Sequence, residues 1–304
     1  MSVQYRDVTL RDGLQLAGKS LPTPRKVELV RELFALGVEH IEVGSMARPD
    51  LVPTMADTLD VIAALTPQER ERAWIWTATP RHIERAAGAG ARNFQYCFSA
   101  SDSHNRANIG RDTESSLAAM PDAIAAAAAV GGRVQLCIAT SFTCPFEGTV
   151  PFERLAGILD DPRTDGAVDV VIADTLGQAH PAEVGRRVRL AAERRPGLGI
   201  VFHGHDTWGL GVANAAAAVD AGATVLDGAL GGLGGCPFAP GASGNTATED
   251  LVFGLRPAWL DPERFGALVR LGEEITTALG EPNRSRARAG ARSHAEAFEW
   301  VLRD

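Results

Sequence analysis

The chain has 304 residues, and 45% of them are hydrophobic, which suits one large globular domain with a sizeable buried core. Its 30 basic and 38 acidic residues leave a net charge of −8. This balance argues against general binding to nucleic acids or to anionic membranes, because both need a concentrated positive field.

Short β-rich runs alternate with longer segments whose apolar residues recur with a 3.6-residue spacing. The runs predict eight strands, at Gln4–Leu10, Val38–Val43, Ala73–Ala78, Asn93–Phe98, Arg133–Ala139, Val168–Ala173, Ile200–His203 and Thr224–Asp227. The spacing predicts helices most clearly over Pro24–Leu36, Thr113–Val130 and Pro181–Glu193. Eight strands, each followed by a helix, predict an α/β fold of the (β/α)8 class, a TIM barrel.

A doubly wound open sheet shares the same alternation and is the competing fold. Its usual Gly-x-Gly-x-x-Gly turn after the first strand is missing, because Leu10 is followed directly by Arg11, Asp12 and Gly13. The barrel is therefore the favoured interpretation.

The C-terminal part, Leu260–Asp304, predicts two or three further helices with a loop around Glu281–Arg292. We therefore divide the chain into a catalytic barrel, residues 1–258, and a short C-terminal helical extension, residues 259–304, packed on the barrel. The loop is rich in arginine and is either a solvated helix connection or an electropositive lid for phosphate groups. Its arginines are Arg284, Arg286, Arg288 and Arg292.

Ionisable residues gather where the predicted strands end. Arg11 and Asp12 follow the first strand, Glu42 ends the second, and Asp174 ends the sixth. His203 and His205 end the seventh strand, and a glycine-rich run follows the eighth. Active sites of (β/α)8 barrels lie at the C-terminal ends of the strands. The distribution therefore predicts an enzyme site rather than a purely structural barrel.

The His203-x-His205 pair predicts a metal site. Side chains two positions apart on a strand point the same way, so both imidazoles can bind one cation. Asp12 is the natural third ligand, and Asn245 can supply its amide oxygen as a fourth. Two nitrogens and two oxygens, with water completing the shell, suit a divalent cation such as Mg²⁺, Mn²⁺ or Co²⁺.

Arg11 is either half of a barrel-end ion pair or a cation that stabilises an oxyanion formed in the site. Glu42 and Asp174 can be ion-pair partners that orient Arg11, or groups that handle protons. The only lysines are Lys19 and Lys26, so a Schiff-base mechanism has just two candidates.

The four cysteines are too few for a disulfide framework, and none forms a Cys-x-x-Cys pair. We therefore expect reduced thiols in a cytoplasmic protein, with no membrane span and no signal peptide. Cys97 and Cys137 lie in apolar strands and are expected to be inert. Cys236 lies among glycines, on a loop that can close over a metal, and its thiol is suited to donate a proton to a carbanion.

Several motifs, in order along the chain, together resemble the 3-hydroxy-3-methylglutaryl-CoA (HMG-CoA) lyase family of metal-dependent lyase and aldolase barrels. The resemblance covers about Tyr5–Leu255. Its motifs are Arg11-Asp12-Gly13-Leu14-Gln15, Val52-Pro53-x-Met55-Ala56-Asp57, Cys144-Pro145-Phe146-Glu147-Gly148, His203-x-His205-Asp206-Thr207, Gly232-Leu233-Gly234-Gly235-Cys236-Pro237, and Gly241-Ala242-Ser243-Gly244-Asn245-x-Ala247-Thr248-Glu249-Asp250.

This resemblance implies cleavage of a 3-hydroxyacyl-CoA to acetyl-CoA and a keto acid such as acetoacetate, by a retro-Claisen reaction that needs Mg²⁺ or Mn²⁺. It further implies an acyl-CoA substrate and a homodimer. The implied metal ligands are Asp12, His203, His205 and Asn245, and the implied catalytic residues are Arg11, Asp12, Glu42, Asp174, His203 and Cys236, with Glu249 as a supporting carboxylate.

The chain departs from the family pattern at positions near the substrate. Cys137 stands where familiar members carry a tyrosine, Val171 where a serine is often seen, and Leu16-Ala17 where Asn-Glu is usual. A lyase for a different 3-hydroxyacyl-CoA is thus one alternative. The others are a Claisen-type condensing synthase and a non-catalytic barrel that retains a metal site.

Overall fold

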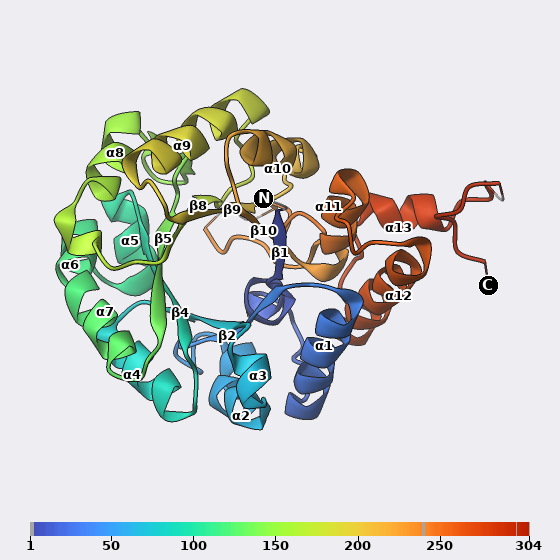
Figure 1. Ribbon diagram of the computed structural model, residues 1–304, viewed down its shortest axis with the longest axis horizontal. Helices are drawn as coiled ribbons and strands as arrows, with labels where there is room; N and C mark the ends of the chain where they lie inside the picture. Colours follow the sequence, from blue (N-terminus) through green and yellow to red (C-terminus); the bar gives the residue numbers. More distant parts are fainter. Residues whose placement is uncertain (1–2, 239–240, 296, 304) are drawn as a thin grey trace.

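The structure, a computed structural model, describes residues 3–238, 241–295 and 297–303. Within these residues eight parallel strands close into a barrel in the order β1-β10-β9-β8-β5-β4-β3-β2. They are β1 Gln4–Asp7, β2 His40–Ser45, β3 Ala73–Thr77, β4 Asn93–Ser99, β5 Arg133–Ala139, β8 Asp169–Asp174, β9 Gly199–Gly204 and β10 Val225–Gly228. Figure 1 shows the helices as a ring around them. The (β/α)8 prediction is confirmed.

The single strand end that differs most from the prediction is the C-terminal end of β1, which lies at Asp7 instead of Leu10. The chain turns there into a short π-helix, Thr9–Gly13, in which the Gly13 amide donates to the Val8 carbonyl at 3.1 Å. Such turns often occur at functional sites. This one carries Arg11 and Asp12.

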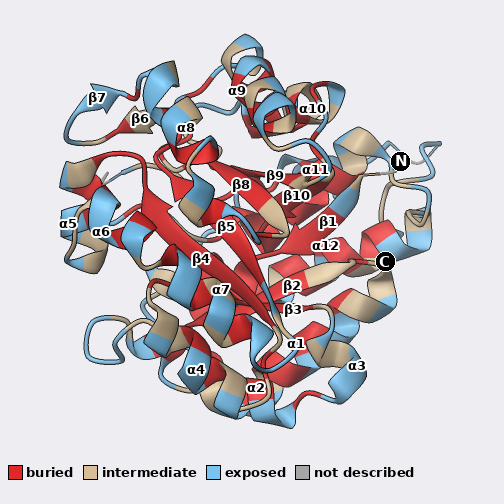
Figure 2. Ribbon diagram, turned by 60° about the vertical axis from the view of Figure 1, so that its left-hand side comes forward, coloured by how far each residue is buried: buried red, intermediate tan, exposed pale blue. Residues whose placement is uncertain are grey.

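The helices surround the barrel, and each turns a buried face inward and an exposed face outward (Figure 2). They are α1 Thr23–Leu36, α2 Thr58–Ala64, α3 Pro67–Arg70, α4 Pro80–Gly88, α5 Asp102–Ile109, α6 Thr113–Ala118, α7 Met120–Ala128, α8 Phe152–Leu159, α9 Pro181–Arg194, α10 Gly211–Asp220, α11 Thr248–Leu255, α12 Pro262–Leu279 and α13 Arg286–Ala291. A small antiparallel hairpin pairs β6 Thr143–Cys144 with β7 Gly148–Thr149.

Two predictions about helices were wrong. The expected helix Thr113–Val130 is split into α6 and α7, because Pro121 lies in the first turn of α7 and a proline ring cannot continue a preceding helix. The expected loop Glu281–Arg292 contains the helix α13, whose N-cap Ser285 accepts a hydrogen bond from the Arg288 amide.

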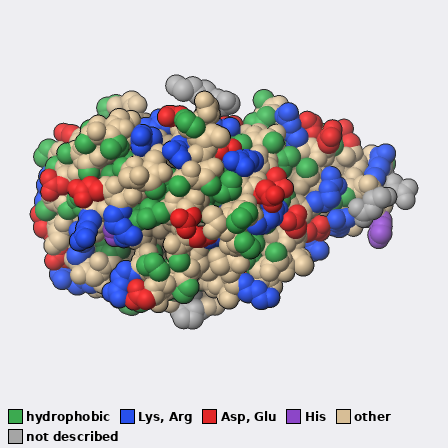
Figure 3. Space-filling model, turned by 90° about the horizontal axis from the view of Figure 1, so that it is seen from below, with side chains coloured by type: hydrophobic (Ala, Val, Ile, Leu, Met, Phe, Trp, Pro, Cys, Tyr) green, Lys and Arg blue, Asp and Glu red, His purple; other side chains and the backbone are tan. Residues whose placement is uncertain are grey.

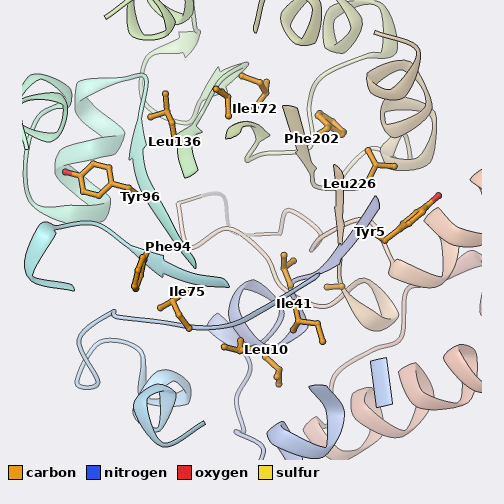
Figure 4. Close-up of a cluster of buried hydrophobic side chains, with 14 of the residues drawn as sticks. Tyr5, Leu10, Ile41, Ile75, Phe94, Tyr96, Leu136, Ile172, Phe202 and Leu226 are labelled. Atoms are coloured by element: carbon orange, nitrogen blue, oxygen red, sulfur yellow. The ribbon is translucent and has the colours of Figure 1, made fainter. Parts of the chain in front are cut away.

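Strand residues alternate between the helix ring and the barrel interior. Figure 4 shows apolar side chains such as Tyr96, Leu136, Phe202 and Leu226 pointing away from the barrel centre toward the helices. All four are buried in the main hydrophobic core. Because successive strand residues face opposite sides, the neighbours of these residues point into the barrel. Cys97, Cys137, His203 and Asp227 are such neighbours.

The C-terminal helices α12 and α13 pack beside α11, on the side where the C-terminus leaves the molecule (Figure 1). Leu268, Leu271, Ile275 and Leu279 of α12 belong to the same hydrophobic core as the barrel. Basic and acidic side chains are interspersed over the face seen in Figure 3. In the part of the chain that the structure describes, no helix has both the length and the apolar character to cross a membrane.

Candidate active site and metal centre

A cavity of about 530 Å³ opens at the C-terminal ends of the strands. One side is lined by the polar residues singled out from the sequence, namely Arg11, Asp12, His203, His205 and Cys236. Trp76, Cys97, Cys137, Ala139 and Ala173 are also in its lining, from β3, β4, β5 and β8. The barrel therefore brings residues from both ends of the chain into one chamber.

Three of the predicted metal ligands gather around one carboxylate oxygen, Oδ2 of Asp12. Nε2 of His205 lies 3.1 Å and Nε2 of His203 lies 3.5 Å from this oxygen. The amide nitrogen of Asn245 donates to the same oxygen at 2.9 Å and to the Leu233 carbonyl at 2.9 Å. All four side chains are buried.

These residues fit a divalent cation. The ligand atoms of Asp12, His203 and His205 lie within 4.8 Å of one another. Nδ1 of His205 and Oδ1 of Asn245 are buried without a hydrogen-bond partner, which is costly for polar atoms. Burial alone would raise the pKa of Asp12, but the Arg11 charge and the hydrogen bonds from both histidines hold it well below its usual value. Asp12 is therefore an anion at neutral pH.

His203 has a second partner that sequence reasoning missed. Its Nδ1 lies 3.0 Å from Oδ2 of Asp227, and this carboxylate also accepts two hydrogen bonds from Arg6, at 2.8 and 2.7 Å. Burial disfavours the charged imidazole, yet Asp12 and Asp227 together raise the pKa of His203 to about 9. A carboxylate behind a metal-binding histidine fixes the ring and leaves the other nitrogen for the metal. The available signal was a charged residue within each of two apolar strands, Arg6 and Asp227.

Arg11 is held between two carboxylates. Its Nε donates to Glu42 at 2.5 Å, and its Nη1 donates to Asp12 at 3.0 Å. Burial opposes the charge, but Glu42 and Asp12 raise the pKa of Arg11. Glu42 is fully buried on β2 and is absent from the cavity lining, so it acts through Arg11.

Asp174, the last residue of β8, is also absent from the cavity lining. Its carboxylate accepts hydrogen bonds from the amides of Gln178 and Ala179, both at 3.1 Å. Burial raises its pKa, and the two amides oppose that rise. The carboxylate therefore organises the loop after β8 and does not face the cavity.

Glu249 holds the start of the glycine-rich loop in place through the Gly231 amide. Both of its carboxylate oxygens lie 3.0 Å from the Gly231 amide, and burial raises its pKa to about 8. Gly272 of α12 leaves room for this carboxyl, because a Cβ there would lie 2.0 Å from Oε1 of Glu249.

Cys236 is buried and lines the cavity. Its loop approaches the metal ligands closely at Gly234, which has φ +107° and would place a Cβ 2.6 Å from the Asn245 amide nitrogen. Only glycine adopts this backbone without strain. The loop thus brings the thiol to the same chamber as Asp12 and the histidines.

Cys97 and Cys137 are buried strand residues, as expected, and both also line the cavity. They are direct neighbours on β4 and β5. The neighbouring Cys137 thiol lowers the pKa of Cys97, with the Arg11 charge acting in the same direction and burial opposing it. Val171, by contrast, is buried beneath the cavity.

Neither lysine lines the cavity, and Lys26 is buried in a pair with Asp57 at 2.5 Å. The C-terminal arginines are absent from the lining as well. Arg288 and Arg292 both pair with Glu273 of α12, at 2.8 and 2.7 Å. These two arginines therefore tie α13 to α12, and the choice between a helix connection and a lid for phosphate groups is not tested by these contacts.

Comparison with known proteins agrees with the fold. The family model described as HMGL-like matches residues 2–264. The chain is 37% identical to a (R)-citramalyl-CoA lyase of Chloroflexus aurantiacus over 92% of each chain, and 33% identical to hydroxymethylglutaryl-CoA lyase YngG of Bacillus subtilis over 93% of this chain and 95% of that one. An HMG-CoA lyase structure from Acinetobacter baumannii, in complex with coenzyme A and 3-methylmalate, has a TM-score of 0.87 at 32% identity and covers 97% of this chain and 96% of that one.

Proposed function

Because this chain belongs to the HMGL-like family, whose members compared above are carbon–carbon lyases, we propose that it is a divalent-metal-dependent lyase that cleaves a 3-hydroxyacyl-CoA to acetyl-CoA and a keto acid. The observation that carries this proposal is the convergence of Asp12, His203 and His205 in one cavity with Arg11 and Cys236. The relatives supply two first substrates, HMG-CoA and (R)-citramalyl-CoA, which would yield acetoacetate and pyruvate.

Asp12, His203, His205 and Asn245 would hold the cation. Mg²⁺ or Mn²⁺ held there would supply a Lewis acid that lowers the pKa of the substrate's 3-hydroxyl group. Asp227 supports this set by fixing the ring of His203.

In the proposed retro-Claisen reaction, a base, either a side chain of the cavity or a water molecule, takes the hydroxyl proton, and the C3–O bond becomes a carbonyl. The C2–C3 bond breaks, and its electron pair moves onto C2 and the thioester oxygen. Arg11, fixed by Glu42 and Asp12, faces the resulting enolate charge. Cys236 then donates its thiol proton to C2, which gives acetyl-CoA. Glu42, Asp174 and Glu249 act as positioning residues in this scheme.

The test measures acetyl-CoA release from both esters with Mg²⁺ or Mn²⁺. We expect chelation and His205→Ala to abolish release. Cys236→Ser should bind Mn²⁺ as the parent does and lose at least about 100-fold in kcat. Undiminished turnover after chelation or in His205→Ala would contradict the proposal, and so would the absence of cleavage of any 3-hydroxyacyl-CoA.

The remaining expectations from the sequence are proposals of the same kind. Residues 1–258 would be the catalytic unit and residues 259–304 an extension of it, which the shared core of α12 and the barrel supports. A cytoplasmic location agrees with four free cysteines. The homodimer is tested by light scattering at micromolar protein concentration.

A further inference from the structure

Two of the four cysteines are neighbours in the barrel sheet. Cys97 lies in β4 and Cys137 in β5, and these parallel strands run side by side (Figure 1). Their register aligns Cys97 with Cys137 and continues without a shift along the whole of β4. Neighbouring strands lie about 4.8 Å apart, and a disulfide needs Cα atoms about 4.4–6.8 Å apart. The backbone therefore already holds these two residues at the distance of a disulfide.

Both side chains turn to the same side of the sheet, into the barrel. Cys97 and Cys137 line the candidate active-site cavity, and they belong to one buried cluster with Val171 and Val201. The inner face of a closed barrel is concave, so side chains on it converge and lie closer together than their Cα atoms. The Cys137 thiol is also the largest influence on the pKa of Cys97, which agrees with side chains that meet. The barrel thus brings together the two sulfur atoms and not only the two backbones.

A buried thiol in an apolar strand is usually inert, but these two differ from that case. The cavity gives small solutes a route to both sulfur atoms. The Cys137 thiol and the Arg11 charge lower the pKa of Cys97, although burial opposes them, whereas the Cys97 thiol and burial raise the pKa of Cys137. The thiolate is the nucleophilic form of cysteine, so Cys97 is the thiol that reacts first and Cys137 the one that follows.

We propose that Cys97 and Cys137 form a modification site, at which hydrogen peroxide converts the two thiols into a disulfide between β4 and β5. In the first step the sulfur of Cys97 attacks one oxygen of the peroxide, the O–O bond breaks, and Cys97 becomes a sulfenic acid while one water leaves. In the second step the sulfur of Cys137 attacks the sulfur of Cys97, the S–O bond breaks, and a second water leaves. The two thiols lose two electrons and two protons, and one peroxide is reduced to two waters.

This disulfide would be easy to reduce. Facing positions on adjacent strands hold the two Cβ vectors nearly parallel, which is not the arrangement of a relaxed disulfide. Strain of this kind makes a disulfide a stronger oxidant, and strained disulfides are the labile ones. We therefore expect thiol reductants to restore both cysteines, so that the modification is reversible.

The other two cysteines have different surroundings. Sγ of Cys144 accepts hydrogen bonds from the Ser101 hydroxyl at 2.9 Å and from two backbone amides, and Cys144 is absent from the cavity lining. Cys236 lines the cavity, but it lies in the glycine-rich loop outside the sheet. Of the four cysteines, all of them within the described residues, only Cys97 and Cys137 face each other in a strand pair.

Peptide mapping tests the site. The reduced full chain, with Mg²⁺ present, is treated with hydrogen peroxide, and the remaining thiols are alkylated in denaturant. Digestion with trypsin and chymotrypsin separates Cys137 from Cys144, because Phe142 lies between them. We expect a peptide pair linked through Cys97 and Cys137, which dithiothreitol separates, and an alkylated Cys144. Cys97 and Cys137 that remain unlinked after peroxide, or that link to Cys236, overturn the inference.

Serine variants assign the two steps. Cys137→Ser removes the second thiol, so the sulfenic acid at Cys97 persists, and we expect its trapping by dimedone to rise at least about tenfold over the parent. Cys97→Ser should give neither the link nor a trapped sulfenic acid at Cys137. Cys144→Ser is the matched control, because it removes a buried thiol outside the cavity lining, and it should form the link as the parent does. Equal trapping in Cys137→Ser and in the parent contradicts the second step.

Phenylarsine oxide probes the pair without any substitution. Its trivalent arsenic bonds to two thiols that lie next to each other, and the second bond forms at a high effective concentration. We expect the arsenical to protect Cys97 and Cys137 from alkylation, to resist an excess of a monothiol, and to block the disulfide. Absence of this protection overturns the inference, even where the serine variants do not fold. Neither readout uses cleavage of an acyl-CoA, so this inference and the lyase proposal can fail separately.

Discussion

Oδ2 of Asp227 lies 3.0 Å from Nδ1 of His203, on the side of the ring that faces away from Asp12. Arg6 holds this carboxylate from the other direction through two hydrogen bonds. The contact lets Nδ1 of His203 keep its proton and donate it in a hydrogen bond to Asp227, so Nε2 of the neutral ring can bind a cation. The candidate metal centre is therefore supported by a further pair of buried residues, Asp227 and Arg6, behind His203.

Asp227→Asn tests this support. The amide keeps the size of the side chain but removes the charge that orients His203 and pairs with Arg6. We expect Mn²⁺ affinity to fall by roughly 10- to 100-fold, measured by calorimetry. Asp169→Asn is the control, because Asp169 also lies in the barrel but accepts a hydrogen bond from Gln135 rather than from a histidine. Equal Mn²⁺ affinity in parent and Asp227→Asn would contradict the assignment.

Glu42→Gln tests whether Glu42 works through Arg11. Loss of the carboxylate frees the guanidinium to move, so we expect kcat to fall by roughly 10- to 100-fold. The dissociation constant for Mn²⁺ should change less than threefold, because Asp12 keeps its place. Glu39→Gln, just before β2 and absent from the cavity lining, is the matched change. A parallel loss of Mn²⁺ binding in Glu42→Gln would assign Glu42 to the metal site instead.

Asp174→Ala separates a structural role from a catalytic one. The substitution leaves the amides of Gln178 and Ala179 without their acceptor, which should cost about 2 kcal/mol in the free energy of unfolding. Urea denaturation measures this loss. The pH profile of kcat should keep its shape, since the carboxylate does not line the cavity. Loss of one limb of that profile would show that Asp174 carries a proton in the reaction.

Glu249 gives a pH-dependent stability. Its pKa is about 8 in the folded chain and about 4.5 when unfolded, so the unfolded chain loses the proton first as pH rises. Folding stability contributed by this group is complete below pH 4.5 and is lost as pH rises toward 8, by at most about 1.4 kcal/mol per pH unit. Burial raises the pKa of Asp7 to about 6, so Asp7 also lowers the folding stability as pH rises, over a lower pH range than Glu249.

Glu249→Gln removes this titration. The difference in unfolding free energy between parent and variant, measured with urea at pH 6.5 and pH 8 under the same metal load, isolates Glu249 from the histidines. We expect the variant to gain about 2 kcal/mol relative to the parent over this interval. A difference that does not change with pH would show that Glu249 is already ionised at pH 6.5.

The sequence predicted the barrel because each strand carries a continuous apolar run that only a sheet covered by helices can bury. His203 and His205 were visible because their spacing puts both imidazoles on one strand face. The helix split at Pro121 was also open to prediction, since the proline stands in the middle of the alanine-rich segment. The prediction of one continuous helix followed the 3.6-residue spacing and disregarded this proline.

The sequence alone could not show which carboxylates point into the barrel and which point toward the helices. Asp174 and Asp227 both lie at the ends of strands, and the direction of each side chain depends on the residue at which the alternation begins. Asp174 shares the outward phase of Ile172, and Asp227 has the phase opposite to Leu226. The pairing of Cys97 with Cys137 depends on the register between β4 and β5, which neither strand alone encodes.

Gly272 links the helix α12 to the candidate active site. It makes room for the Glu249 carboxyl, which accepts a hydrogen bond from the Gly231 amide in the glycine-rich loop. A chain that ends before Pro262 would lack α12, and the Glu249 carboxyl, which is buried in the full chain, would be exposed to water. Exposure to water would lower the pKa of Glu249, and the Gly231 amide would lose its fixed hydrogen-bond acceptor. Shortening this protein from its C-terminal end would therefore disturb the loop that carries Cys236 as well as the core that α12 shares with the barrel.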